Sequence, residues 1–153
     1  MTKFGLLALG LASSLTAQAA INIEITQGVD SATPVAVVPF GSVGTLPEDV
    51  AAIVARDLQF SGRVNPMNRA SMPSFPDSSN AVDPSQWKGM EYMVLGRVEP
   101  NGAGYTGSFE LLNLFGGAAG MVMDSARNSF DARGFRRYAH YVSDKVYEKL
   151  FNE

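Results

Sequence analysis

Three polar residues near the C-terminus have the side-chain types of a hydrolase triad. His140, Ser143 and Asp144 are spaced i, i+3 and i+4, so that on a helix they share one face. A triad requires the histidine to point at the serine hydroxyl while the carboxylate holds the histidine from behind. Neighbouring side chains on one helix point in roughly the same direction and do not meet this requirement. We interpret the three residues as a hydrogen-bonded cluster on a helix surface, with hydrolysis as the weaker alternative.

A glycine pattern at residues 102–107 is a second candidate site. The run Gly-Ala-Gly-Tyr-Thr-Gly spells G-x-G-x-x-G, which binds a dinucleotide pyrophosphate where it opens a helix. Here it lies between two stretches with the composition of strands, and so it predicts a hairpin turn. A kinase glycine loop also lies in a hairpin, but the motifs that complete a kinase site are absent from the sequence. We therefore expect no nucleotide cofactor.

Residues that bind metals or act as nucleophiles are sparse. The sequence has one histidine and no cysteine, which leaves no ligand set for a transition metal and no disulfide. Glu48 and Asp49 are adjacent carboxylates, but the N-terminus of a helix favours negative charge without any catalytic role. The sequence therefore predicts no catalytic residue, no cofactor and no metal site, and we expect a protein that is not an enzyme.

The charge balance is mildly acidic, with 12 basic and 15 acidic residues. Nucleic acids and anionic lipids bind proteins through clustered lysine and arginine, so neither is an expected partner. We interpret the one basic group as solvated charge around the start of a helix, with an anion site as the alternative. This group consists of Arg127, Arg133, Arg136 and Arg137.

Residues 1–19 have the three-part order of a cleavable signal peptide. Lys3 gives a positive start, residues 4–15 are mainly apolar, and a small-x-small site precedes the expected cleavage between Ala19 and Ala20. The apolar stretch is too short for a membrane span, which takes about 20 apolar residues. We therefore predict export to the periplasm without an integral membrane segment. An uncleaved amphipathic helix is the alternative.

Alternating and β-branched patterns predict the strands. Isoleucines at every second position of 21–26 alternate with polar residues, as in a half-buried strand. The apolar run at 35–40 indicates a buried strand closed by a proline and an aromatic residue. Three further strands, separated by glycine turns, are expected at residues 91–99, 105–115 and 121–130.

Two stretches repeat apolar residues every three to four positions and predict amphipathic helices. The first covers 45–62, starts at a capping box formed by Thr45 and a glutamate three residues later, and ends at Gly62. The second covers 135–151, with Asp131 as the expected N-cap.

The order of these elements predicts an α+β fold. Residues 65–86 contain four prolines and indicate a long irregular connection, with a short helical turn near 83–88. We expect a mixed sheet of four to five strands, with two main helices packed on one face around a single core.

Beyond these general patterns, several stretches resemble one known family. In order along the chain they are residues 37–40 (VVPF), 53–66 (IVARDLQFSGRVNP), Trp87, 92–96 (YMVLG) and 139–150 (AHYVSDKVYEKL). Together they resemble the N-terminal domain of the TolB family, a periplasmic component of the Tol-Pal envelope system of Gram-negative bacteria. This resemblance covers almost all of the chain after the signal peptide.

The resemblance implies a binding partner for the N-terminal segment. In the family, the first residues after the signal peptide bind the C-terminal domain of TolA. The matching positions are Ala20, Ile21, Asn22, Ile23, Glu24, Ile25, Thr26, Gln27, Gly28, Val29, Asp30 and Ser31. The implied organisation is a signal peptide at 1–19, a partner-binding strand segment at 20–33 and a TolB-like domain at 34–153.

The resemblance also limits what can be expected. The family's domain precedes a six-bladed β-propeller that carries the contact with the lipoprotein Pal, and this sequence has no stretch that matches it. We therefore do not expect Pal binding. The expected role is a non-enzymatic adaptor that supports outer-membrane integrity and invagination during division. Two alternatives stay open: a segment 20–31 that completes the domain's own sheet, and a chain that is a structural remnant without TolA binding.

Overall fold

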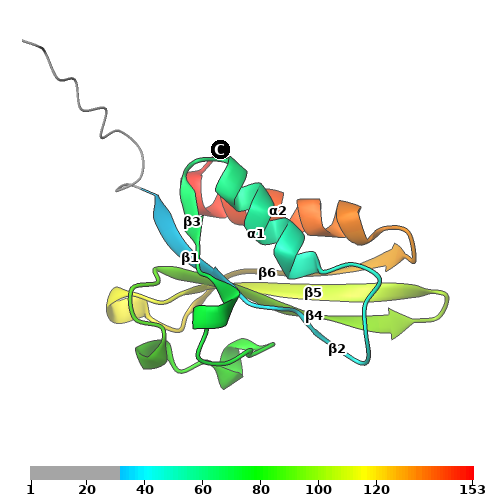
Figure 1. Cartoon of the computed structure of the whole chain (residues 1–153), viewed down its shortest axis with the longest axis horizontal. Coiled ribbons are helices and arrows are strands. Elements are labelled where there is room, and N and C mark those ends of the chain that lie inside the picture. The colour runs from blue at the N-terminus through cyan, green and yellow to red at the C-terminus, as the bar shows by residue number, and fades with distance from the viewer. Residues whose placement is uncertain (1–31) are drawn as a thin grey trace, which may run out of the picture.

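A mixed sheet with both α-helices on one face forms the framework of the protein (Figure 1). The computed structural model describes residues 32–153. The signal peptide, its cleavage site and the strand expected at 21–26 all lie outside these residues. The α+β class and the placement of the two helices are as predicted from the sequence.

The sheet combines parallel and antiparallel pairs. Its strands are β1 (Thr33–Val37), β2 (Gly41–Ser42), β3 (Val64–Pro66), β4 (Tyr92–Asn101), β5 (Gly104–Asn113) and β6 (Val122–Asp131). The order across the sheet is β3-β1-β4-β5-β6, and the short β2 also pairs with β4. β1 is parallel to β3 and β4, whereas β4, β5 and β6 form an antiparallel meander. The two predicted hairpins are confirmed, but β2 and β3 increase the sheet to six strands.

Helix α1 (Val50–Phe60) begins later than the capping box at Thr45 predicts. The N-cap is Asp49, whose carboxylate accepts a hydrogen bond from the backbone N–H of Ala52 at 2.9 Å. The expected start was wrong because an aspartate nearer the periodic stretch satisfies the free N–H groups of the first turn. The end is as expected: Gly62 adopts a left-handed conformation and donates a backbone hydrogen bond to Gln59.

Helix α2 (Phe135–Phe151) matches its predicted range. Its N-cap is Gly134 rather than the expected Asp131. The Asp131 carboxylate instead accepts a hydrogen bond from the backbone N–H of Arg133, and its carbonyl accepts one from Gly134. Asp131 therefore closes the turn that leads from β6 into the helix, three residues before the N-cap.

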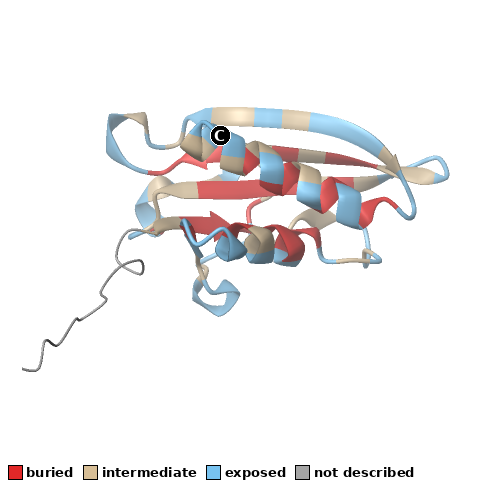
Figure 2. Ribbon diagram, turned by 90° about the horizontal axis from the view of Figure 1, so that it is seen from above, coloured by how far each residue is buried: buried red, intermediate tan, exposed pale blue. Residues whose placement is uncertain are grey.

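The main core lies between the helices and the sheet (Figure 2). α1 and α2 pack against each other and against the same face of β1, β4 and β5. Gly107 in β5 permits a close approach of α2, because a Cβ atom there would lie only 2.7 Å from Tyr138 Oη. The fully buried residues include Val35, Val54, Val94, Val98, Phe109, Leu111, Ala139, Val142 and Val146.

A second core covers the opposite face of the sheet, contrary to the single core expected from the sequence. The connection between β3 and β4 folds under the sheet as three 3-10 turns, the last of which is the predicted turn at Pro84–Gln86. Trp87, which is 2% exposed, packs there with Met93, Leu95 and Leu112. The connection contributes apolar residues without a regular period, so no repeat in the sequence marks it as part of a core.

Arg63 brings the two ends of the described chain together. Its backbone carbonyl accepts a hydrogen bond from the N–H of Thr33 at 2.8 Å. Its guanidinium forms an ion pair with Glu153 at 2.9 Å and lies over the ring of Phe151, 4.1 Å from the centroid. The start of β1 and the end of α2 therefore lie at the same end of the molecule (Figure 1).

Candidate partner-binding surface

The predicted TolA-binding residues, 20–31, lie outside the described residues, and only their point of attachment is visible. The chain enters the structure at Ala32, directly before β1. β1 and β4 are parallel, and β6 runs antiparallel to β5 and therefore in the same direction as β4. The segment 20–31 is thus attached at the end of the sheet where β1, β4 and β6 begin.

The His140 cluster bonds to a carboxylate that the sequence did not indicate. His140 Nδ1 lies 2.6 Å from Asp57 Oδ2 in α1, and the Ser143 hydroxyl donates to the same oxygen at 2.8 Å. The histidine and the serine are each bonded to the carboxylate and not to each other, so no base is aimed at the hydroxyl. The cluster joins α1 to α2, as a structural hydrogen-bond network does, and its acid is Asp57 rather than Asp144.

The glycine pattern at 102–107 forms the turn between β4 and β5. Asn101 pairs with Gly104, which leaves two residues in the turn, and Gly102 has a φ of 60°. Thr106 lies within β5 and hydrogen-bonds Asn101 and Ser129. No helix starts at this point, so the hairpin interpretation is confirmed.

The adjacent carboxylates at the start of α1 bind two different arginines. Glu48 accepts from Arg136 at 3.0 Å, and Asp49 accepts from Arg69 at 2.9 Å. Burial alone would raise the pKa of Asp49, but the hydrogen bonds from Arg69 and from the backbone of Ala52 outweigh it and lower the pKa. Both carboxylates therefore hold α1 in place.

The four arginines do not form one basic cluster. Arg136 is bound to Glu48, and Arg137 lines a hollow beside α2. Arg127 lies in β6 opposite Ser108, on the sheet face that does not carry the helices. Only part of the group therefore surrounds the start of α2, because β6 ends and turns before the helix begins.

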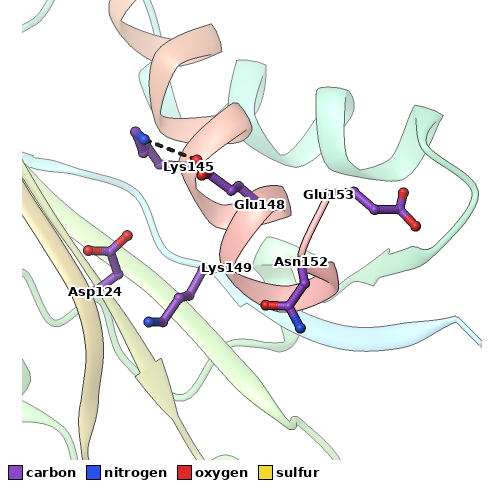
Figure 3. A pocket seen from close by; sticks show the side chains of 6 residues that line it. All are labelled: Asp124, Lys145, Glu148, Lys149, Asn152 and Glu153. Atoms are coloured by element: carbon purple, nitrogen blue, oxygen red, sulfur yellow. Dashed lines mark hydrogen bonds and ion pairs between the residues drawn. The ribbon is translucent and has the colours of Figure 1, made fainter.

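β6 forms an exposed edge of the sheet. Although β5 beside it is largely buried, no residue of β6 is (Figure 2). A hollow of about 430 Å³ lies between the end of β6 and α2, lined mainly by Phe130, Tyr138, Tyr141 and Arg137. A second, charged hollow of about 450 Å³ lies farther along; Asp124 and Lys149 are among its lining residues, and Lys145 is bonded there to Glu148 (Figure 3).

Two further features bear on the kind of site. Within residues 32–153, no helix is long and apolar enough to cross a membrane. The same residues contain no group of three or more histidine, aspartate or glutamate side chains placed to hold a metal ion.

Comparisons with known proteins agree on one family. Residues 21–119 match the model of the TolB amino-terminal domain. The Tol-Pal system protein TolB of Haemophilus influenzae (strain PittGG) is 40% identical over 146 residues, which is 93% of this chain and 34% of that protein. The protein of the same name from Actinobacillus pleuropneumoniae serotype 5b (strain L20) is 36% identical over 148 residues, or 95% of this chain and 34% of its own length.

A solved structure agrees with the sequence matches. The crystal structure of TolB from Acinetobacter baumannii superposes with a TM-score of 0.68 at 26% identity, over 84% of this chain and 31% of that chain. The chain therefore spans about a third of the length of the relatives that it matches. The family match covers most of the chain, and the protein belongs to the TolB amino-terminal domain family.

Proposed function

We propose that this chain is a non-enzymatic periplasmic adaptor domain of the Tol-Pal system that binds the C-terminal domain of TolA through residues 20–31. The observation that carries the proposal is the family match, which begins at residue 21 and so covers all of the segment except its first residue. The role that follows is support of outer-membrane integrity and of invagination during cell division. The proposal does not extend to Pal, because the chain spans only 34% of the relatives' length.

The pattern of the segment supports binding by strand addition. Ile21, Ile23 and Ile25 alternate with polar residues, so the segment, when extended, has one apolar and one polar face. Added to the sheet of a partner, it would gain affinity from backbone hydrogen bonds and specificity from the isoleucines. Its attachment at the start of β1 leaves the cores of the domain intact while it binds.

The signal-peptide pattern supports a periplasmic location. Residues 1–19 carry the order of charge, apolar stretch and cleavage site that directs export. The family match starts two residues after the predicted cleavage site, at residue 21. Mass spectrometry of the exported chain would give the N-terminus directly, and we expect Ala20.

The direct test is calorimetric titration of the exported chain with the cognate TolA C-terminal domain. We expect saturable binding that is lost when residues 20–31 are deleted, with an unchanged circular dichroism spectrum because residues 32–153 contain both cores. Unchanged binding by the deletion variant would show that the contact lies elsewhere. A folded chain that gives no heat would favour a structural remnant instead.

A matched pair of variants tests the strand mechanism. Replacing Ile21, Ile23 and Ile25 by asparagine removes the apolar face of the segment. We expect binding to weaken at least tenfold, because three apolar side chains that would be buried against the partner are lost. Replacing Asn22 and Thr26 by serine alters only the polar face, so the dissociation constant should stay within about threefold of that of the parent. An equal loss of affinity in both variants would contradict binding through the apolar face.

A further inference from the structure

β6 is a long strand with one unpaired side. Within residues 32–153 it pairs only with β5, and its ten residues include neither lysine nor proline, which commonly protect the edge of a sheet. The register with β5 shifts between Leu111 and Leu112, so the start of β6 is irregular and its regular part runs from Asp124 to Asp131. The outer N–H and C=O groups of this regular part can bond to another strand.

The side chains of β6 divide between the two faces of the sheet. On the helix side, Phe130 lies opposite Tyr105, stacks on Tyr138 and lines the hollow of about 430 Å³. On the other side, Arg127 and Asp131 are four residues apart and face the same way. Both are exposed, and neither forms an ion pair with a residue of 32–153. The polar side therefore offers one positive and one negative charge.

These two charges make the strand complementary to itself. In an antiparallel pair of identical strands, a two-fold axis through one residue pairs the residues before it with those after it. With the axis at Ser129, Arg127 of each copy lies opposite Asp131 of the other, which gives two equivalent ion pairs. An axis at Asn128 would set Arg127 opposite Ser129 without an ion pair. An axis at Arg127 would set two guanidinium groups against each other.

The helix side fits the same axis. Asn128 then lies opposite Phe130 of the second copy, and the two Phe130 rings are diagonal neighbours at a spacing that aromatic side chains can bridge. The hollow is lined by residues 128–131 of the strand and by Tyr138 and Tyr141 of α2, so the hollows of two copies meet at the axis. A second copy would therefore cover an apolar surface as well as the free backbone groups.

We propose that a second copy of this chain pairs antiparallel with β6 across a two-fold axis at Ser129, and so forms a dimer with one continuous sheet. Each copy contributes residues 127–131 to the new strand pair, Arg127 and Asp131 to the two ion pairs, and Phe130 to the shared apolar contact. This surface is separate from the segment 20–31. Its test contains no TolA, so a negative result leaves the proposed function untouched.

Analytical ultracentrifugation of the exported chain tests whether the dimer forms. Only five residues of each strand pair, so the dimer is weak and its population rises with protein concentration. We expect a reversible equilibrium between monomer and dimer over about 1 μM to about 1 mM, the range that suits a small interface. A chain that stays monomeric throughout this range would overturn the proposal.

Two charge variants locate the contact. Arg127→Asp sets carboxylates against each other at both ion pairs, and Asp131→Arg does the same with guanidinium groups. Each variant alone should therefore dimerise at least tenfold more weakly than the parent. In an equimolar mixture of the two, every pair across the interface is again one acid and one base, so association should recover.

Arg56→Asp is the matched control for these variants. Arg56 is exposed on α1, so the change alters the net charge equally but lies away from β6, and the variant should dimerise as the parent does. Circular dichroism checks that each variant is folded. If Arg127→Asp and Arg56→Asp weaken the dimer equally, or if Arg127→Asp has no effect, the contact lies elsewhere and the proposal is wrong.

A single cysteine tests the position of the axis in a chain that has none of its own. Ser129→Cys places the thiols of two copies opposite each other, about 5 Å apart at Cα, which suits a disulfide. Ser125→Cys is the matched control on the same side of β6, but its two copies lie about 27 Å apart along the strand pair. The disulfide-linked dimer should form at least tenfold faster with Ser129→Cys. Equal rates would overturn the pairing at Ser129.

Discussion

Asp49 connects the start of α1 to a distant part of the chain. Its carboxylate caps the helix through Ala52 and binds Arg69 in the connection that follows β3. One side chain therefore satisfies a free N–H group of α1 and also binds the start of the connection that forms the second core.

Asp49→Ala is expected to lower the free energy of unfolding by about 1 kcal/mol, the usual cost of losing an N-cap. The pKa of Asp49 is lowered from 3.8, so its contribution is present above pH 3.8 and is lost as the pH falls through the lowered value. Urea unfolding should thus show a full difference from the parent at neutral pH and a shrinking one below pH 3.8. Asp49→Ser keeps a capping oxygen and should lose less; an equal loss would contradict the capping role.

Tyr138 carries a buried hydroxyl without a hydrogen-bond partner within residues 32–153. Burial raises the pKa of Tyr138, and the neighbouring Tyr141 adds to the effect. Because an unpaired hydroxyl costs free energy when buried, Tyr138→Phe should leave stability unchanged or raise it by up to about 1 kcal/mol.

The pH dependence of the Tyr138 variant has a defined sign. A raised pKa means that the contribution of the neutral tyrosine is complete below pH 10.0 and declines as the pH rises through the folded-state pKa. Tyr138→Phe should remove this alkaline loss in urea titrations above pH 10.0. Tyr138→Leu, which also removes the stacking on Phe130, should be destabilised; a loss in the Phe variant as well would indicate a hidden partner for the hydroxyl.

At the residue scale, the role of the His140 cluster could be predicted from the sequence, but the partner of its histidine could not. The spacing of His140 and Ser143 indicated a shared helix face and a structural cluster, and both are correct. Asp57 was missed because it lies 83 residues away from His140, and only the packing of α1 on α2 brings it near. Periodicity gives no information on pairs that are distant along the chain.

At the element scale, the contact between β5 and α2 depends on a missing side chain. Gly107 is the position where the ring of Tyr138 touches the sheet. Glycine is needed here because α2 comes close to β5, and not because the backbone turns: Gly107 has the conformation of an ordinary strand.

Gly107→Ala should therefore lower the free energy of unfolding by about 1–3 kcal/mol, as expected for an overpacked core. Gly117→Ala is the matched control, because a Cβ atom there meets nothing within 4 Å. Combining Gly107→Ala with Tyr138→Leu should recover part of the loss in urea unfolding. No recovery would mean that the cost comes from the strand itself and not from contact with the helix.

Long, regular elements were the ones that the sequence predicted well. α2 and the three antiparallel strands have strong periodic patterns and short turns between them. β3 was missed because three residues ending in a proline carry no pattern, and they pair only because β1 lies beside them. The second core was missed for a related reason: its apolar residues are scattered along an irregular connection.

At the scale of the whole molecule, the two cores share one sheet. β4 contributes Val94 to the helix side and Met93 and Leu95 to the other. Since adjacent residues of one strand belong to different cores, neither core can be lost without disrupting the strand that supports both.

Unfolding of the two cores should therefore be a single cooperative event. Trp87 is the only tryptophan and lies in the second core, so its fluorescence reports that side, while far-ultraviolet circular dichroism reports mainly the helices. The two urea transitions should coincide in midpoint and slope. An earlier fluorescence transition would show that the connection from β3 to β4 unfolds separately.

The meeting of the two chain ends at Arg63 has a mechanical consequence. A pull applied between Ala32 and Glu153 acts between two points at the same end of the molecule, because Thr33 and Glu153 both contact Arg63. The load crosses the contacts of Arg63 and the start of β1, and it does not stretch β4, β5 or β6 along their length. Under tension between these two points, we expect the contacts of Arg63 and the start of β1 to break first, while the antiparallel meander of β4, β5 and β6 stays unloaded.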